Sequence, residues 1–100
     1  MRTKDKYTRE HRKVLQLARE YTRKGYEVSC EVPIGENKFR ADLVARKGDE
    51  TIVIEVKSSD SLRVEKKQIA ELAKYVSTLI PGARFDLVLT NPRDKVSAKR

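Results

Sequence analysis

The chain has 100 residues, enough for one small core, and we expect residues 1–100 to form a single domain. Its 38% hydrophobic residues argue against disorder, and its net charge of +8 favours a polyanionic partner, with nucleic acid the leading candidate. The single cysteine excludes an intrachain disulfide and indicates a reducing, cytoplasmic compartment. No apolar run approaches the ~20 residues of a membrane span, so we expect no membrane partner.

A first helix is predicted from about Tyr7 to Lys24, because apolar residues recur there at helical spacing. Gly25 is suited to end this helix, since glycine readily adopts the left-handed conformation that follows many helices. One face of the helix would hold Tyr7, Glu10, His11, Val14, Leu17, Ala18 and Tyr21. The basic segments 1–6 and 92–100 are predicted to be flexible ends of the domain.

Four strands and a second helix are predicted after the first helix. Strands are expected at residues 26–32, 39–46, 51–57 and 84–90. One face of the first strand would hold Tyr26, Val28, Cys30 and Val32. The second helix has candidate N-caps in residues 58–61 and stops before Pro81. Its crossover connection places the last strand parallel to the third. The predicted fold is therefore α/β, an αβββαβ core with a four-stranded mixed sheet flanked by helices.

The second and third strands are predicted to pair as a hairpin with Gly48 and Asp49 at its tip. One face of this hairpin would be wholly apolar, with the pairs Ala45–Ile52, Leu43–Ile54 and Ala41–Val56. The other face would hold the pairs Val44–Val53, Asp42–Glu55 and Arg40–Lys57. A shift of one residue would mix apolar with charged partners, which argues for this register.

The pairing of Asp42 with Glu55 is the most informative feature of the sequence. It sets two like charges about 5 Å apart at Cβ, which destabilises a bare sheet. A divalent cation removes the conflict, and Mg²⁺ prefers one or two carboxylates together with waters and phosphates. Lys57 emerges on the same face as Glu55, so the pattern predicts the hydrolysis of phosphodiesters. The alternative is a charged, exposed strand face without chemistry.

The stretches Arg40-Ala-Asp-Leu-Val44 and Ile52-Val-Ile-Glu-Val-Lys-Ser58, with the helix and strand that follow, resemble the PD-(D/E)xK nuclease superfamily. The resemblance is closest to its archaeal Holliday-junction-resolvase-like, restriction-endonuclease-like branch, and it covers roughly residues 10–90. Ala41 stands where the family name has proline. The resemblance implies a Mg²⁺-dependent endonuclease that hydrolyses DNA, with selectivity for branched DNA as one option.

The resemblance also implies roles for individual residues. Asp42 and Glu55 would bind Mg²⁺ or Mn²⁺ with the Val56 carbonyl, and Lys57 would hold the attacking water and stabilise charge on the phosphate. Resolvase-like members also use a glutamate on the first helix. Glu10 is the candidate, because it lies near the apolar stripe whereas Glu20 lies well away from it. The alternative for Glu10 is an acid that only stabilises the helix dipole.

Four further residues carry weaker indications. His11 could act as a general base or simply be a packed or surface histidine. Gln68 corresponds to a helix glutamine in some branches of the superfamily, but it lies at the edge of the second helix's apolar stripe. Arg40 could contact phosphate or pair with Glu31 across the strands. Cys30 is most simply a core residue.

Two functions of different classes remain in competition. The first is a DNA endonuclease, and the second is a non-catalytic DNA-binding or regulatory module on the same fold. A basic scaffold or inhibitor would leave the paired acids without a purpose, while RNA stays open as a substrate. A homodimer is expected because a duplex has two strands to cut, although a larger nuclease complex could replace the second copy. The preferred DNA structure, the sequence preference, the pathway and the oligomeric state do not follow from the sequence.

Overall fold

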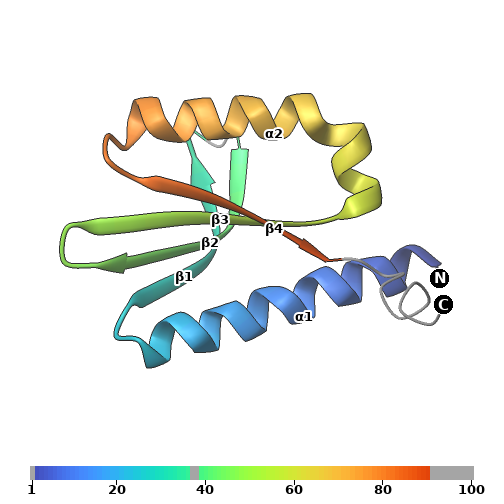
Figure 1. The fold of residues 1–100 in the computed structure, drawn as a ribbon, viewed down its shortest axis with the longest axis horizontal. Coiled ribbons are helices and arrows are strands. Elements are labelled where there is room, and N and C mark those ends of the chain that lie inside the picture. The colour runs from blue at the N-terminus through green and yellow to red at the C-terminus, as the bar shows by residue number, and fades with distance from the viewer. Residues whose placement is uncertain (1, 37–38, 91–100) are drawn as a thin grey trace, which may run out of the picture.

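The computed structural model describes residues 2–36 and 39–90, and its elements follow the predicted order (Figure 1). The helices and strands are α1 (Arg2–Arg23), β1 (Glu27–Ile34), β2 (Phe39–Lys47), β3 (Glu50–Ser58), α2 (Ser59–Leu79) and β4 (Arg84–Thr90). Helix α1 begins five residues before the predicted start at Tyr7. The predicted flexible ends therefore fall on residues 2–6, which are helical, and on residues 1 and 92–100, which lie outside the described residues.

The strands form one mixed sheet in the order β1-β2-β3-β4. β1, β2 and β3 pair antiparallel, and β4 pairs parallel to β3 after the crossover through α2. Figure 1 shows α1 and α2 on opposite sides of the sheet. The structure thus confirms the predicted α/β class and the restriction-endonuclease-like arrangement of elements. Neither helix in the described part of the chain combines the length and the hydrophobicity of a membrane-spanning helix.

Two hydrophobic clusters fill the space between the sheet and its two helices. The cluster under α1 is made by Val14, Leu17, Ala18, Tyr21, Tyr26, Val28, Leu43, Ala45, Ile52, Ile54, Val56 and Val88. The cluster under α2 includes Ile34, Ala41, Val44, Val53, Leu72 and Val76, with Phe39 and Tyr75 packed against it. Strand β3 supplies both clusters, because alternate residues of a strand point to opposite faces. It is therefore buried on both sides, as a central strand covered by helices should be.

Helix α1 ends where the sequence predicts, at Gly25. The amide of Gly25 donates to the Thr22 carbonyl at 3.0 Å, and the amide of Tyr26 donates to the Tyr21 carbonyl at 3.0 Å. This pair of bonds is the Schellman arrangement, which needs a left-handed residue after the helix. Gly25 has a φ of 93° and meets that need. The chain can then turn directly from α1 into β1.

The predicted hairpin register is confirmed in the half of the β2–β3 pair that lies next to the turn. The paired residues run from Lys47–Glu50 to Leu43–Ile54, and Gly48 has a φ of 59° at the tip. The prediction of a wholly apolar face fails beyond this point. Ala41 packs in the cluster under α2, whereas its predicted partner Val56 packs under α1.

Strand β1 changes face at the same level of the sheet. Glu31 has a φ of 54°, a left-handed conformation that costs a non-glycine residue about 1–2 kcal/mol. It falls between the paired residues Cys30–Leu43 and Val32–Ala41. Val28 consequently faces α1 and Val32 faces α2.

Two expectations for β1 are therefore wrong. Val28 and Val32 do not share a face, because the left-handed residue between them rotates the rest of the strand. Cys30 is exposed and is not a core residue. The sheet is regular towards the hairpin turn and irregular at the level of Asp42, the neighbour of Glu31 across the strands.

Candidate active site

Asp42 and Glu55 lie where β2 and β3 part, and each carboxylate binds the main chain of the opposite strand. The Val56 amide donates to Asp42 Oδ2 at 2.8 Å, and the Asp42 amide donates weakly to Glu55 Oε1 at 3.4 Å. These side-chain bonds stand where the hairpin ladder would otherwise continue past Leu43–Ile54. The side chains of the two acids thus lie between the strands, where they replace the main-chain hydrogen bonds of the ladder.

The electrostatics of this pair show the conflict that the sequence predicts. Only 10% of the Glu55 side chain is exposed, and this burial, with the nearby Asp42 charge, raises the pKa of Glu55 to about 7. Burial also raises the pKa of Asp42, although the bond from the Val56 amide and the Lys57 charge oppose that rise. Both carboxylates therefore carry negative charge at a cost, which a bound cation would relieve.

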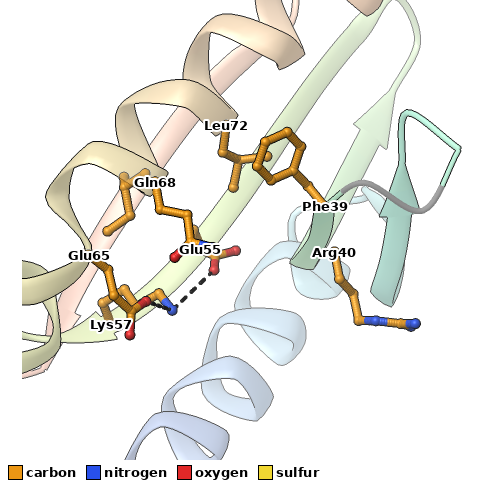
Figure 2. Close-up of a pocket in the computed structure, with 8 residues that line it drawn as sticks. Phe39, Arg40, Glu55, Lys57, Glu65, Gln68 and Leu72 are labelled. Atoms are coloured by element: carbon orange, nitrogen blue, oxygen red, sulfur yellow. Dashed lines mark hydrogen bonds and ion pairs between the residues drawn. The ribbon is translucent and has the colours of Figure 1, made fainter.

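Lys57 reaches from β3 towards α2 and lies between two acids (Figure 2). Its ammonium Nζ is 2.6 Å from Glu65 Oε1 and 3.8 Å from Glu55 Oε2. Burial lowers the pKa of Lys57, but the hydrogen bond from its ammonium to Glu65 and the charges of Glu55 and Glu65 more than offset this, so the net pKa is raised. The lysine is therefore a cation at neutral pH.

Glu65 is the residue near the site that the sequence did not indicate. It is one of several charged residues on the polar side of α2, and helical periodicity gives no reason to single it out. The one signal in the sequence is that Glu65 follows Lys57 by eight residues, near the start of α2. This spacing brings the two side chains together only because the helix bends at Glu65.

Glu10 is brought to the same end of β3, as its place on the predicted helix face suggests. Its Oε2 accepts a hydrogen bond from the Ser58 amide at 2.8 Å. Glu20 instead accepts a bond from the Gln16 side chain at 3.3 Å on the surface of α1. The main chain on both sides of Lys57 is thus held by carboxylates, at Val56 by Asp42 and at Ser58 by Glu10.

The acidic residues line two hollows, which lie on opposite faces of the sheet. A hollow of about 340 Å³ under α2 is lined by Phe39, Arg40, Glu55, Lys57, Glu65, Gln68, Ile69 and Leu72. A smaller one of about 160 Å³ beside α1 is lined by Glu10, His11, Val14, Leu15, Cys30, Glu31 and Asp42. Glu55 and Lys57 thus line the hollow under α2, whereas Asp42 and Glu10 line the hollow beside α1.

The weaker candidates are divided between the two hollows. Gln68 is exposed in the wall under α2, and His11 is exposed beside α1. Arg40 points away from Lys57 in Figure 2. Its guanidinium makes a 3.4 Å bond to the main-chain carbonyl of Glu31, so the contact between these residues uses the backbone of Glu31.

The donor atoms at the strand gap suit a hard divalent cation. Asp42 and Glu55 offer carboxylate oxygens that are partly buried and mutually repelling. In the part of the chain that the structure describes, no three acids, histidines or cysteines are grouped closely enough to form a complete metal cage. Two carboxylates completed by main-chain, water and phosphate oxygens are the arrangement that Mg²⁺ prefers. The residues present therefore fit such an ion.

An αβββαβ core with an acid on β2 and Glu-x-Lys on the adjacent β3 defines the restriction-endonuclease-like class of nucleases. The chain belongs to the AHJR-like family (REase_AHJR-like), the restriction endonuclease, archaeal Holliday junction resolvase-like family, whose model matches residues 2–100. The resemblance inferred from the sequence is thereby confirmed. No curated protein matches the chain.

Proposed function

We propose that the protein is a metal-dependent endonuclease that hydrolyses DNA phosphodiester bonds at the gap between β2 and β3. The observation that carries the proposal is that the Asp42 and Glu55 carboxylates each bind the main chain of the opposite strand, with the Lys57 cation beside Glu55. A purely structural sheet would have no use for two partly buried, mutually repelling acids at this position.

Asp42 and Glu55 would hold Mg²⁺, or Mn²⁺ in its place, with the Val56 carbonyl as a further oxygen ligand. The bound ion would lower the pKa of a coordinated water and offset charge on the phosphate. Lys57 would orient the attacking water and stabilise negative charge on a phosphate oxygen. Its charged ammonium at the wall of the larger hollow suits both tasks.

Glu10 would contribute in two ways. It fixes the Ser58 amide, and so the main chain next to Lys57. Its carboxylate also lines the smaller hollow together with Asp42, where it adds to the negative potential that attracts a cation. We expect it to assist the site without being one of the two principal metal ligands.

DNA is the proposed substrate because the chain carries an excess of eight positive charges, which attracts polyanions. A domain of 100 residues has little surface for reading sequence, so selectivity for branched DNA such as a four-way junction is proposed. A homodimer would place two such sites on the two strands of one substrate. Sedimentation at micromolar protein with and without junction DNA tests this, and a monomer that cuts both strands would contradict it.

The test of function is a panel of labelled substrates: four-way junction, flap, single strand, plain duplex and RNA. Each is incubated with Mg²⁺, Mn²⁺ or EDTA. We expect cleavage of a DNA substrate with either metal and none with EDTA. Binding of DNA without cleavage under all conditions would instead identify a non-catalytic DNA-binding module, and preferential cleavage of RNA would overturn the substrate assignment.

A further inference from the structure

Glu65 lies where α2 departs from helical geometry. Its φ of −104° and ψ of 15° interrupt the helix, and Figure 1 shows the first turns of α2 bending away from the rest. Sharp bends usually occur at proline, glycine or an inserted group. Residues 59–79 contain neither proline nor glycine. The bend therefore has a different cause, and at the bend the side chain of Glu65 makes a contact with Lys57 of β3.

That contact is the short ion pair with Lys57. The ammonium is 2.6 Å from Glu65 Oε1 but 3.8 Å from Glu55 Oε2, so it is drawn towards α2. Lys57 and Glu65 are partly buried, with 22% and 34% of their side chains exposed. Both line the larger hollow, and Figure 2 shows Glu65 reaching down from α2 to meet Lys57.

We propose that Glu65 is a positioning residue that holds the Lys57 ammonium away from Glu55, an inference that rests on the nuclease function proposed above. A lysine side chain has a flexible four-carbon stem and settles against the nearest anion. Among the described residues, the other carboxylate within ion-pair distance of Lys57 is Glu55. Without Glu65 the ammonium would close on Glu55 and occupy the oxygens that a metal ion requires.

The variants that test this are Glu65→Gln, which removes the charge, and Glu65→Asp, which keeps it. Glu71→Gln is the matched control. Glu71 lies on the same helix and is exposed, and it lines a separate hollow with Phe39 and Tyr75. Its substitution changes the net charge of the protein by the same amount without touching Lys57.

The first readout is the affinity for Mn²⁺ without DNA, measured by calorimetry. We expect Glu65→Gln to weaken it several-fold, Glu65→Asp to recover most of it, and Glu71→Gln to stay within about two-fold of the wild type. The Glu65→Gln substitution is then made in a Lys57→Ala background. There it should have no further effect, because Glu65 acts through Lys57. An equal loss in both backgrounds would mean that Glu65 supplies only general negative charge, and it would overturn the proposal.

The second readout separates catalysis from binding. At saturating junction DNA, Glu65→Gln should lower the single-turnover rate about ten-fold, while the DNA Kd measured in Ca²⁺ changes by less than about two-fold. An unchanged rate and an unchanged Mn²⁺ affinity would overturn the role of Glu65. If the wild-type protein cuts no substrate, the nuclease proposal fails, while the Mn²⁺ titrations still decide whether Glu65 positions Lys57.

Discussion

The two halves of the β2–β3 hairpin are built on opposite principles. Next to the turn, from Leu43–Ile54 to Lys47–Glu50, the strands pair regularly, and their apolar side chains fill the two clusters. At the other end, Asp42 and Glu55 replace the ladder with side-chain bonds to the opposite main chain. The regular half stabilises the fold by apolar packing, whereas the parted half holds two acids that repel each other. Substitutions in the two halves should therefore have different consequences.

The largest effect is expected from removing either acid of the parted half. Asp42→Asn or Glu55→Gln should lower cleavage by on the order of 1,000-fold, since a metal ion contributes several kcal/mol to the transition state. The unfolding free energy without metal should be unchanged or slightly higher, because repulsion between the acids is relieved. Cleavage assays and urea denaturation on the same samples check both statements. Full activity in either variant would contradict the site.

Lys57→Ala removes the cation of the parted half. Cleavage should fall about 100-fold, as expected for the loss of a charge that stabilises the transition state. DNA affinity should change little, because one lysine is a small part of a footprint of many phosphate contacts. The rate at saturating DNA and the Kd in Ca²⁺ separate these effects. If both fall by the same factor, Lys57 is only a binding residue.

Leu43→Ala tests the regular half. Leu43 is fully buried between the sheet and α1, so its truncation should cost about 2–5 kcal/mol of unfolding free energy. The fraction of protein that stays folded should still bind Mn²⁺ with near wild-type affinity. Urea denaturation and metal titration are the measurements. A loss of metal affinity as large as that of Asp42→Asn would show that the two halves are not separable.

Glu10→Gln should slow cleavage about ten-fold, and more than Glu20→Gln does. Glu10 binds the Ser58 amide beside Lys57, whereas Glu20 binds Gln16 on the outer surface of α1. Both substitutions remove one negative charge from the same helix, so each is a control for the other. Equal effects would show that the contact with Ser58 is not needed for activity.

The smallest effect is a dependence of stability on pH in EDTA. The pKa of Glu55 is about 7 in the folded protein and 4.5 without the fold's influence, so folding favours its protonated form. The stability gained from that proton is fully present below about pH 4.5 and is lost as pH rises through about 7. Urea denaturation at pH 5 and pH 7.5 should show this loss in the wild type and a smaller one in Glu55→Gln. Parallel behaviour of the two proteins would contradict the burial of this charge.

The regular half of the hairpin could be predicted because alternation and turn chemistry act locally. Leu43, Ile52 and Ile54 alternate with residues of the other face, and one register alone keeps apolar partners together. The face of α1 that packs on the sheet could be predicted for the same reason, because its apolar residues, such as Val14 and Leu17, stand at helical spacing. The sequence also predicted that Asp42 and Glu55 lie close together. It did not predict that the strand ladder stops beside them.

The parts that could not be predicted depend on contacts between distant segments. Glu31 adopts a left-handed conformation that its residue type does not favour, so the change of face in β1 and the exposure of Cys30 had no local signal. The bend at Glu65 occurs in a stretch without glycine or proline, and its contact with Lys57 closes only in the folded chain. Local propensity carries no information about such contacts.

The amides of Val56 and Ser58 have a consequence for hydrogen exchange. Each is held by a carboxylate from another element, Val56 by Asp42 of β2 and Ser58 by Glu10 of α1. Their protection against exchange therefore depends on the charge state and position of two acidic side chains, whereas the amides of a regular ladder depend on neighbouring main chain. The exchange rates of these two amides would therefore report the charge state and position of Asp42 and Glu10 without any substrate present.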